Sequence, residues 1–123
     1  MALYESGENY LETILVLSKR NGQVRSVDIA AELDFSKPSV SRAIGILKKE
    51  GLIEVDEGGW IELTEAGRRR ADALFDRHKV IAGYLSDVLG VKPETAEEDA
   101  CRIEHIISEE TFEKMKEELA ART

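Results

Sequence analysis

The chain has 123 residues, with 25 acidic and 17 basic side chains and a net charge of −8. No apolar run approaches the roughly 20 residues that a membrane-spanning helix requires, so we expect no membrane partner. The single cysteine excludes a disulfide framework within the chain, and the first residues lack the pattern of a signal peptide. These features predict a cytoplasmic protein in a reducing compartment. A monomer of this size buries only roughly 65% of its unfolded surface, which favours a dimer.

The acidic excess is distributed unevenly. Residues 1–70 carry 10 basic and 12 acidic side chains, whereas residues 71–123 carry 7 and 13. The segment 37–49 contains four basic side chains and no acidic one. Such a segment is either a solvated helix face or a nucleic-acid site, and its structural context must decide between them.

Apolar residues at helical spacing predict a first helix from about Leu3 to about Arg20, which stops at Asn21 and Gly22. Asn9 and Glu12 lie three residues apart and therefore share a face of this helix. An exposed edge of an amphipathic helix is the plain interpretation of that face.

The next two elements have the spacing of a helix-turn-helix. Ser26 is expected to cap a helix over 27–33, and a tight turn follows at Asp34 and Phe35. Ser36 is expected to cap the second helix, with Pro38 in its first turn. The second helix directs polar and basic side chains outward, namely Lys37, Ser39, Ser41, Arg42, Lys48 and Lys49.

A β-hairpin is predicted directly after these helices, with strands at 52–55 and 60–63 joined by a turn at 56–59. A helix-turn-helix followed by such a wing indicates DNA binding. The segment 52–64 contains neither Lys nor Arg, so we expect the wing to contribute little phosphate contact.

The second half is predicted to be helical. Thr64 is expected to cap a long helix ending at Gly90, a second helix covers 94–107, and Ser108 caps a terminal helix. The predicted fold is therefore mainly α, with an N-terminal winged helix-turn-helix domain over 1–70 and a helical domain over 71–123. The apolar faces of this second domain exceed what one small chain covers, which favours a homodimer interface.

One group of residues in this half has metal-binding chemistry. Cys101, Glu104 and His105 stand at i, i+3 and i+4, so a thiol, a carboxylate and an imidazole share one helix face. His78, the other histidine, is on the preceding helix. The alternative interpretation is a structural cysteine beside a surface Glu and His.

At this point the sequence resembles the diphtheria toxin repressor family of metal-dependent transcriptional regulators along nearly its full length. The resemblance rests on Glu-Asn-Tyr-Leu-Glu-Thr-Ile at 8–14, Ser-Lys-Pro-Ser-Val-Ser at 36–41, and Asp-Ala-Cys-Arg-Ile-Glu-His at 99–105. Leu63, Thr64, Gly67, Arg77, His78 and Ser108 also fit the family's pattern. The resemblance implies a winged helix joined to a helical metal-binding and dimerisation domain. It further implies a member close to the manganese transport regulator branch, and we expect the two-domain form because the sequence stops at Thr123.

Carried over residue by residue, the resemblance implies metal ligands at Glu12, His78, Cys101, Glu104, His105 and Asn9. Asn9 departs from both branches, since the manganese branch has Asp there and the iron branch has Met. Cys101 matches the iron branch, whereas Glu12 matches the manganese branch. Ala82 and Glu97 stand where the iron branch has ancillary ligands. The soft thiolate favours Fe(II) over Mn(II), and we expect Zn(II), Co(II) and Ni(II) also to bind in vitro.

For DNA, the resemblance implies contacts from Ser36, Lys37, Pro38, Ser39 and Arg42, with Arg42 at a base edge and Lys37 at a phosphate. The implied function is a non-enzymatic repressor of metal-uptake genes that binds a palindromic double-stranded operator as a homodimer. Two alternatives stand beside it. One is a winged-helix regulator without a metal site, constitutive or responsive to an organic ligand, and the other is a metalloenzyme or metal-storage protein.

Overall fold

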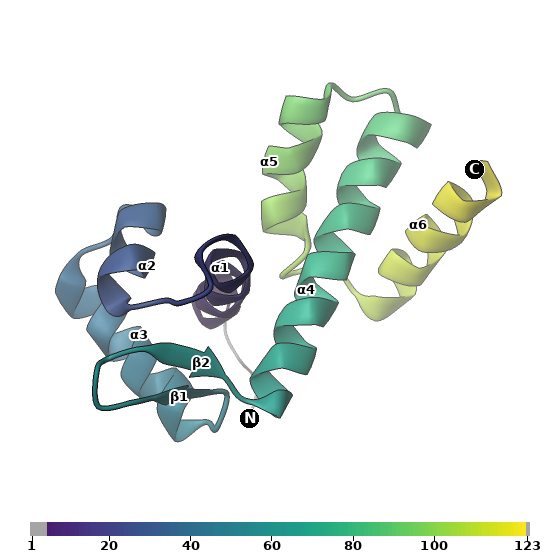
Figure 1. The fold of residues 1–123 in the computed structure, drawn as a ribbon. Coiled ribbons are helices and arrows are strands. Elements are labelled where there is room, and N and C mark those ends of the chain that lie inside the picture. The colour runs from purple at the N-terminus through teal and green to yellow at the C-terminus, as the bar shows by residue number, and fades with distance from the viewer. Residues whose placement is uncertain (1–4, 123) are drawn as a thin grey trace. The chain divides into compact units, whose positions relative to one another are not determined.

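The computed structural model describes residues 5–122, so the predicted start of the first helix near Leu3 lies outside the described residues. Three helices are followed by a hairpin and then by further helices (Figure 1). In chain order the elements are α1 (Glu5–Asn21), α2 (Ser26–Leu33), α3 (Lys37–Lys49), β1 (Ile53–Val55), β2 (Ile61–Leu63), α4 (Glu65–Gly83), the π-helical turn η1 (Tyr84–Val88), α5 (Pro93–Ile103) and α6 (Glu109–Arg122). The mainly helical fold class with one small hairpin is confirmed.

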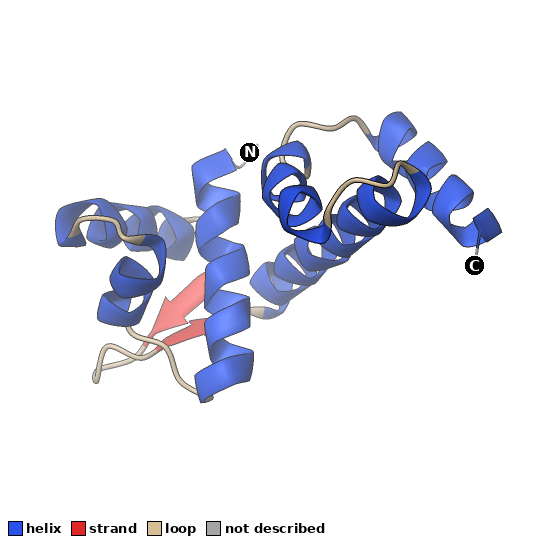
Figure 2. Cartoon of the chain, turned by 90° about the horizontal axis from the view of Figure 1, so that it is seen from above, coloured by secondary structure: helices blue, strands red, loops and turns tan. Residues whose placement is uncertain are grey.

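The chain divides into two compact units, Met1–Asp72 and Ala73–Thr123, with the boundary inside α4. The first unit contains the helix-turn-helix and the hairpin, and Figure 2 shows the two short strands in red beside the helices of this unit. Over the residues described, the second unit contains helices joined by short turns and no strand. Between residues 5 and 122, no helix is both long and apolar enough to cross a bilayer.

In the first unit, α1 packs against α2, α3 and β2, and α2 packs against α3. Buried side chains recur at helical spacing on α1 and α3, and α2 adds one more, so these short helices are stabilised mainly by packing against one another. These side chains are Leu11, Ile14 and Leu15 of α1, Ile29 of α2, and Val40, Ile44 and Leu47 of α3. The charged face of α3 is thereby directed away from this core.

The start of α3 follows the prediction, whereas the start of α2 differs from it. The Ser36 hydroxyl accepts a hydrogen bond from the Ser39 amide at 3.3 Å, and Pro38 lies in the first turn of α3. For α2, the cap is Arg25 rather than Ser26, because the Asp28 carboxylate accepts from the Arg25 amide at 2.9 Å. Ser26 is therefore the first residue of α2 rather than its cap, and the Asp28 carboxylate satisfies the main-chain amide of the cap residue.

The hairpin is a short antiparallel pair in which Ile53 faces Leu63 and Val55 faces Ile61. Its tip is held by Asp56, whose Oδ1 accepts from the amides of Gly58 and Trp60, both at 2.9 Å. Gly59 completes the turn with a φ of 83°, which a glycine adopts without strain. The wing is therefore stabilised by the acidic side chain at its tip.

The second unit has a core of Ile81, Ala82, Ala100 and Phe112. In Figure 1, α5 and α6 lie on opposite sides of α4. The contact with α6 is close, because a Cβ on Gly83 would lie 3.2 Å from Leu119 Cδ2. Ser108 caps α6 as predicted, since its hydroxyl accepts from the Thr111 amide at 3.1 Å.

The helix predicted over 94–107 is shorter than expected and ends at Ile103. Beyond it, the amides of His105 and Ile106 bond to carbonyls three residues back, which is a tighter turn than an α-helix. Glu104 is the C-terminal cap, and His105 lies in the turn that leads to α6. The predicted regular helix therefore holds at Cys101, whereas Glu104 lies at its end and His105 beyond it.

Candidate metal centre and nucleic-acid interface

All five residues expected to contact DNA lie at the start of α3 and are exposed, namely Ser36, Lys37, Pro38, Ser39 and Arg42. The Ser36 hydroxyl also donates to the Ser39 hydroxyl at 2.9 Å, so the two small polar side chains form one local unit. Small side chains at this point leave the helix backbone accessible to a close partner.

Arg42 also acts on the interior of the first unit. Burial raises the pKa of Tyr10, and the positive charge of Arg42 opposes that increase. Tyr10 makes an edge-to-face contact with Phe35, with ring centroids 5.9 Å apart. Helix α1 is thus coupled to the turn before α3 and, electrostatically, to α3 itself.

Two features of this surface are not among those predicted from the sequence. Ile46 is 52% exposed and stands four residues after Arg42, so it shares the exposed face of α3 that carries Arg42. The Arg25 guanidinium lies 4.0 Å from the centroid of the Trp60 ring, which places a cation over the wing although the wing contains none of its own. The spacing from Arg42 could have indicated Ile46, but no local signal indicates the Arg25 contact.

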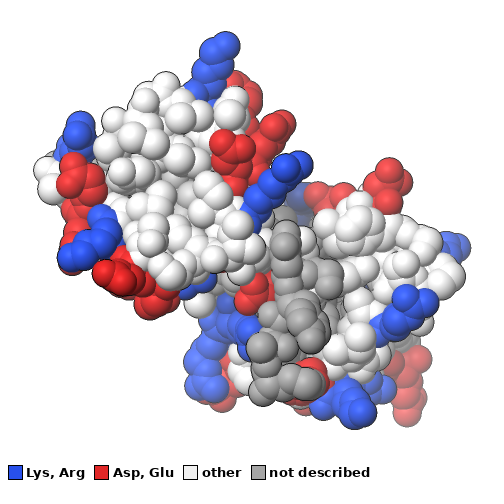
Figure 3. All heavy atoms as spheres, turned by 180° about the vertical axis from the view of Figure 1, so that it is seen from behind, with Lys and Arg blue, Asp and Glu red and all other residues white. Residues whose placement is uncertain are grey.

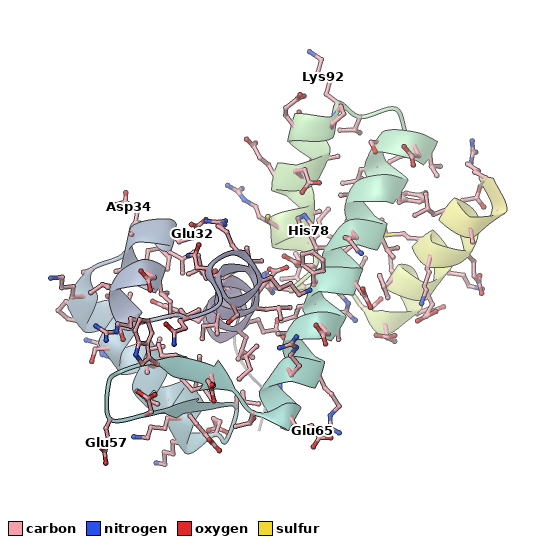
Figure 4. The ribbon with its side chains drawn as sticks, in the orientation of Figure 1. Glu32, Asp34, Glu57, Glu65, His78 and Lys92 are labelled. Carbon is pink, nitrogen blue, oxygen red and sulfur yellow. The ribbon has the colours of Figure 1, made fainter. Side chains whose placement is uncertain are left out.

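In the second unit, three of the predicted ligands come together between α4 and α5. His78 Nδ1 lies 3.6 Å from Glu104 Oε1 and 3.9 Å from Cys101 Sγ. One nitrogen, one sulfur and one oxygen of His78, Cys101 and Glu104 all lie within 4.8 Å of one another. Figure 4 shows His78 on α4, on the side toward α5.

Glu104 is fully buried, which is costly for a carboxylate without compensating charge or hydrogen bonds. His105 Nε2 lies 3.5 Å from Glu104 Oε1, so imidazoles approach the same carboxylate oxygen from two directions. Imidazole, thiolate and carboxylate are ligands suited to divalent transition metals. The donor set therefore fits such an ion.

Arg77 holds the segment that carries Glu104. Its guanidinium donates to the Glu104 carbonyl at 3.2 Å and to the Glu109 carboxylate at 2.7 Å, and it lies 5.1 Å from the centroid of the Phe112 ring. One side chain of α4 thus fixes the end of α5 and the start of α6. These contacts span 27 and 32 residues, so no local pattern could have indicated them.

Asn9 and Glu12 lie in the first unit, half-buried and one helical turn apart on α1. Glu97, which stands where the iron branch has an ancillary ligand, places its Oε2 2.5 Å from His78 Nε2. On the face drawn in Figure 3, acidic and basic side chains are interspersed over the described surface.

Comparisons with known proteins agree with both halves of this description. Residues 2–59 match the family described as iron dependent repressor, N-terminal DNA binding domain. Residues 64–122 match iron dependent repressor, metal binding and dimerisation domain. The two matches together cover nearly the whole chain.

Individual relatives differ in length. The transcriptional regulator MntR of Escherichia coli O157:H7 is 38% identical over 109 residues, which cover 89% of this chain and 70% of MntR. The iron-dependent repressor IdeR of Mycobacterium tuberculosis H37Rv is 34% identical over 113 residues, covering 92% of this chain and 49% of IdeR. The diphtheria toxin repressor of Corynebacterium glutamicum is 31% identical over 117 residues, covering 95% of this chain and 51% of that repressor.

Solved structures give the same result. The crystal structure of T. acidophilum IdeR has a TM-score of 0.82 and 29% sequence identity, covering 98% of this chain and 55% of that one. The manganese regulator SloR has a TM-score of 0.81 and 28% identity, with the same coverage of 98% and 55%. A regulator without a metal site is not supported, because the second unit matches a metal-binding domain. The chain belongs to the diphtheria toxin repressor family of metal-dependent transcriptional regulators, and it combines that family's DNA-binding domain with its metal-binding and dimerisation domain.

Proposed function

We propose that this chain represses metal-uptake genes and binds its operator when loaded with Fe(II) or Mn(II), with Fe(II) favoured. The observation that carries the proposal is the meeting of His78 Nδ1, Cys101 Sγ and the Glu104 carboxylate in a chain that also has an exposed recognition helix. The names of the relatives support both metals, since IdeR is called iron-dependent and SloR a manganese regulator.

The proposed ligands in the second unit are His78, Cys101, Glu104 and His105. Glu12 and Asn9 are added on the family resemblance alone. A divalent cation bound here supplies positive charge to the carboxylate and the thiolate. His78 comes from α4, Cys101 from α5 and Glu104 from the end of α5, so the ligand set joins two helices and the turn that follows them. Arg77 holds the main chain of that turn through the Glu104 carbonyl.

For DNA, we assign base-edge contact to Arg42 and phosphate contact to Lys37, with Ser36, Pro38 and Ser39 at the groove. A homodimer presents two recognition helices, which fit a palindrome whose half-sites are about one helical turn apart. The exposed, acid-free surface of α3 supports this assignment.

The preference for Fe(II) follows from the Cys101 thiolate, because soft ligands favour Fe(II) over Mn(II). The test is operator binding by metal-free protein titrated with Fe(II) under anaerobic conditions, and separately with Mn(II), with the bound metal counted. We expect half-maximal operator binding at a lower free concentration of Fe(II) than of Mn(II). Equal operator affinity with metal and with chelator would disprove metal control altogether.

A matched variant separates metal choice from metal control. Cys101→Glu replaces the soft ligand with a hard one, so we expect its Mn(II) response to improve relative to its Fe(II) response. As a control, Cys101→Glu must still bind the operator when either Fe(II) or Mn(II) is present. An unchanged ratio of Fe(II) to Mn(II) responses would show that Cys101 does not set the preference.

A further inference from the structure

His78 has a polar partner on each of its two ring nitrogens. Nε2 lies 2.5 Å from Glu97 Oε2, whereas Nδ1 faces Glu104 Oε1 at 3.6 Å and Cys101 Sγ at 3.9 Å. The side chain of Glu97 is 63% exposed, whereas that of Glu104 is fully buried. The ring therefore lies between an outer carboxylate and the inner ligand cluster.

Each nitrogen faces a carboxylate, but only the contact of Nε2 with Glu97 is within hydrogen-bond distance. A neutral imidazole carries one N–H donor and one acceptor nitrogen, and an ionised carboxylate only accepts hydrogen bonds. Glu97 therefore favours the tautomer with the proton on Nε2, which leaves the Nδ1 lone pair directed at Cys101 and Glu104. A metal requires that lone pair.

We propose that Glu97 is a positioning residue for the metal centre, which sets the tautomer and ring orientation of His78 by accepting a hydrogen bond from its Nε2–H. This inference rests on the proposed metal site, and it assigns Glu97 a role outside the set of ligands. Glu97 stands one helical turn before Cys101 on α5, so a single helix supplies both the thiolate ligand and the carboxylate that orients the imidazole.

The geometry favours this role over direct ligation. Glu97 contacts Nε2 of His78, whereas Cys101 and Glu104 face Nδ1. In this arrangement Glu97 and the cluster would not bind the same ion. Its exposure also allows substitution without opening a cavity, which makes the inference testable in the folded protein.

The experiment is a Co(II) titration of the metal-free full chain in competition with a chelator, with the thiolate-to-cobalt charge-transfer absorption as the readout. Glu97→Ala should weaken Co(II) binding by about 10- to 100-fold, the usual effect of removing such an outer carboxylate. Glu97→Gln should stay within about threefold of the wild type, because its amide oxygen still accepts from Nε2–H. Glu98→Ala, at an exposed position on the same helix, is the matched control and should bind like the wild type.

At saturation, all variants should give the same absorption spectrum, because their ligands are unchanged. A different saturated spectrum for Glu97→Ala would make Glu97 a ligand and overturn the inference, as would wild-type affinity in that variant. A wild-type protein without a thiolate band would instead disprove the proposed metal site. Nitrogen-15 NMR of the two histidines provides a second readout, since Glu97→Ala should shift the His78 tautomer away from Nε2–H in metal-free protein, and an unchanged tautomer would also overturn the inference.

Discussion

Gly67 and Gly45 are both helical, but their surroundings differ completely. A Cβ on Gly67 would lie 1.9 Å from the carbonyl oxygen of Leu52, at the base of the wing. A Cβ on Gly45 would meet nothing within 4 Å. Close backbone approach therefore explains the glycine at Gly67, whereas no contact within the described residues requires the glycine at Gly45.

Gly67→Ala should lower the free energy of unfolding of the first unit by about 1–3 kcal/mol, the usual cost of overpacking. The gain in helix propensity, about 1 kcal/mol, does not offset a clash with backbone. The measurement is urea unfolding followed by the fluorescence of Trp60, the only tryptophan of the chain.

Gly45→Ala is the matched control and should raise the same free energy by about 0.5–1 kcal/mol, because alanine loses less backbone entropy than glycine in a helix. If both substitutions destabilise the protein equally, the contact between Gly67 and Leu52 is not the reason for the loss.

The two acidic residues at the wing tip also differ. Glu57 is exposed, and Glu57→Ala should leave operator affinity within about threefold of the wild type, because the wing tip offers no positive charge to phosphates. Fluorescence anisotropy with labelled operator measures this. A loss of tenfold or more would place the tip in contact with DNA. Asp56 is unsuitable for the same test, because its carboxylate holds the amides of Gly58 and Trp60.

At the level of the elements, local signals predicted most of the fold. The Ser36 cap, the hairpin and the Ser108 cap each depend on residues within a few positions of one another. For the proposed ligands of the second unit, the sequence indicates the residue types but not their geometry. Their arrangement depends on α5 ending at Ile103 and on contacts across 19 to 32 residues, which periodicity cannot reveal.

At this scale, Arg77 is the residue whose contacts between helices should matter most for metal binding. Arg77→Ala removes the bonds to the Glu104 carbonyl and the Glu109 carboxylate, so the turn that carries Glu104 and His105 loses its support. We expect metal affinity to fall by about 10-fold or more, as when other groups that orient ligands are removed. Arg77→Lys should not restore it, because an ammonium does not reproduce the planar two-way contact. Competition with a chelator measures the affinity.

The control is Lys116→Ala, which removes one exposed positive charge from α6. It should leave metal affinity unchanged. Equal losses in the two variants would attribute the effect of Arg77 to charge alone rather than to its contacts with the turn.

For the whole molecule, the net charge of −8 limits binding to DNA of unrelated sequence. An acidic protein repels phosphates outside the recognition helix, so binding to a scrambled duplex should lie at the weak end of the usual range, about 10⁻⁴ M at physiological salt. The double variant Glu110→Lys with Glu113→Lys should tighten this non-specific binding, because it removes two exposed acidic charges and adds two basic ones. An affinity near 10⁻⁶ M for the scrambled duplex in the wild type would show that the acidic charge does not limit non-specific binding.

If the metal controls operator binding, the operator must also affect metal binding. If the metal raises operator affinity by some factor, the operator must raise metal affinity by the same factor, because both follow from one coupling free energy. Typical couplings change the affinity by about 5- to 150-fold. A Co(II) titration with and without saturating operator resolves a change of that size in metal affinity. We expect Glu104→Ala to bind operator equally with and without metal, since it removes the buried carboxylate that His78 and His105 both approach. A metal affinity that is unaffected by operator in the wild type would contradict a shared equilibrium, even if both ligands bind tightly.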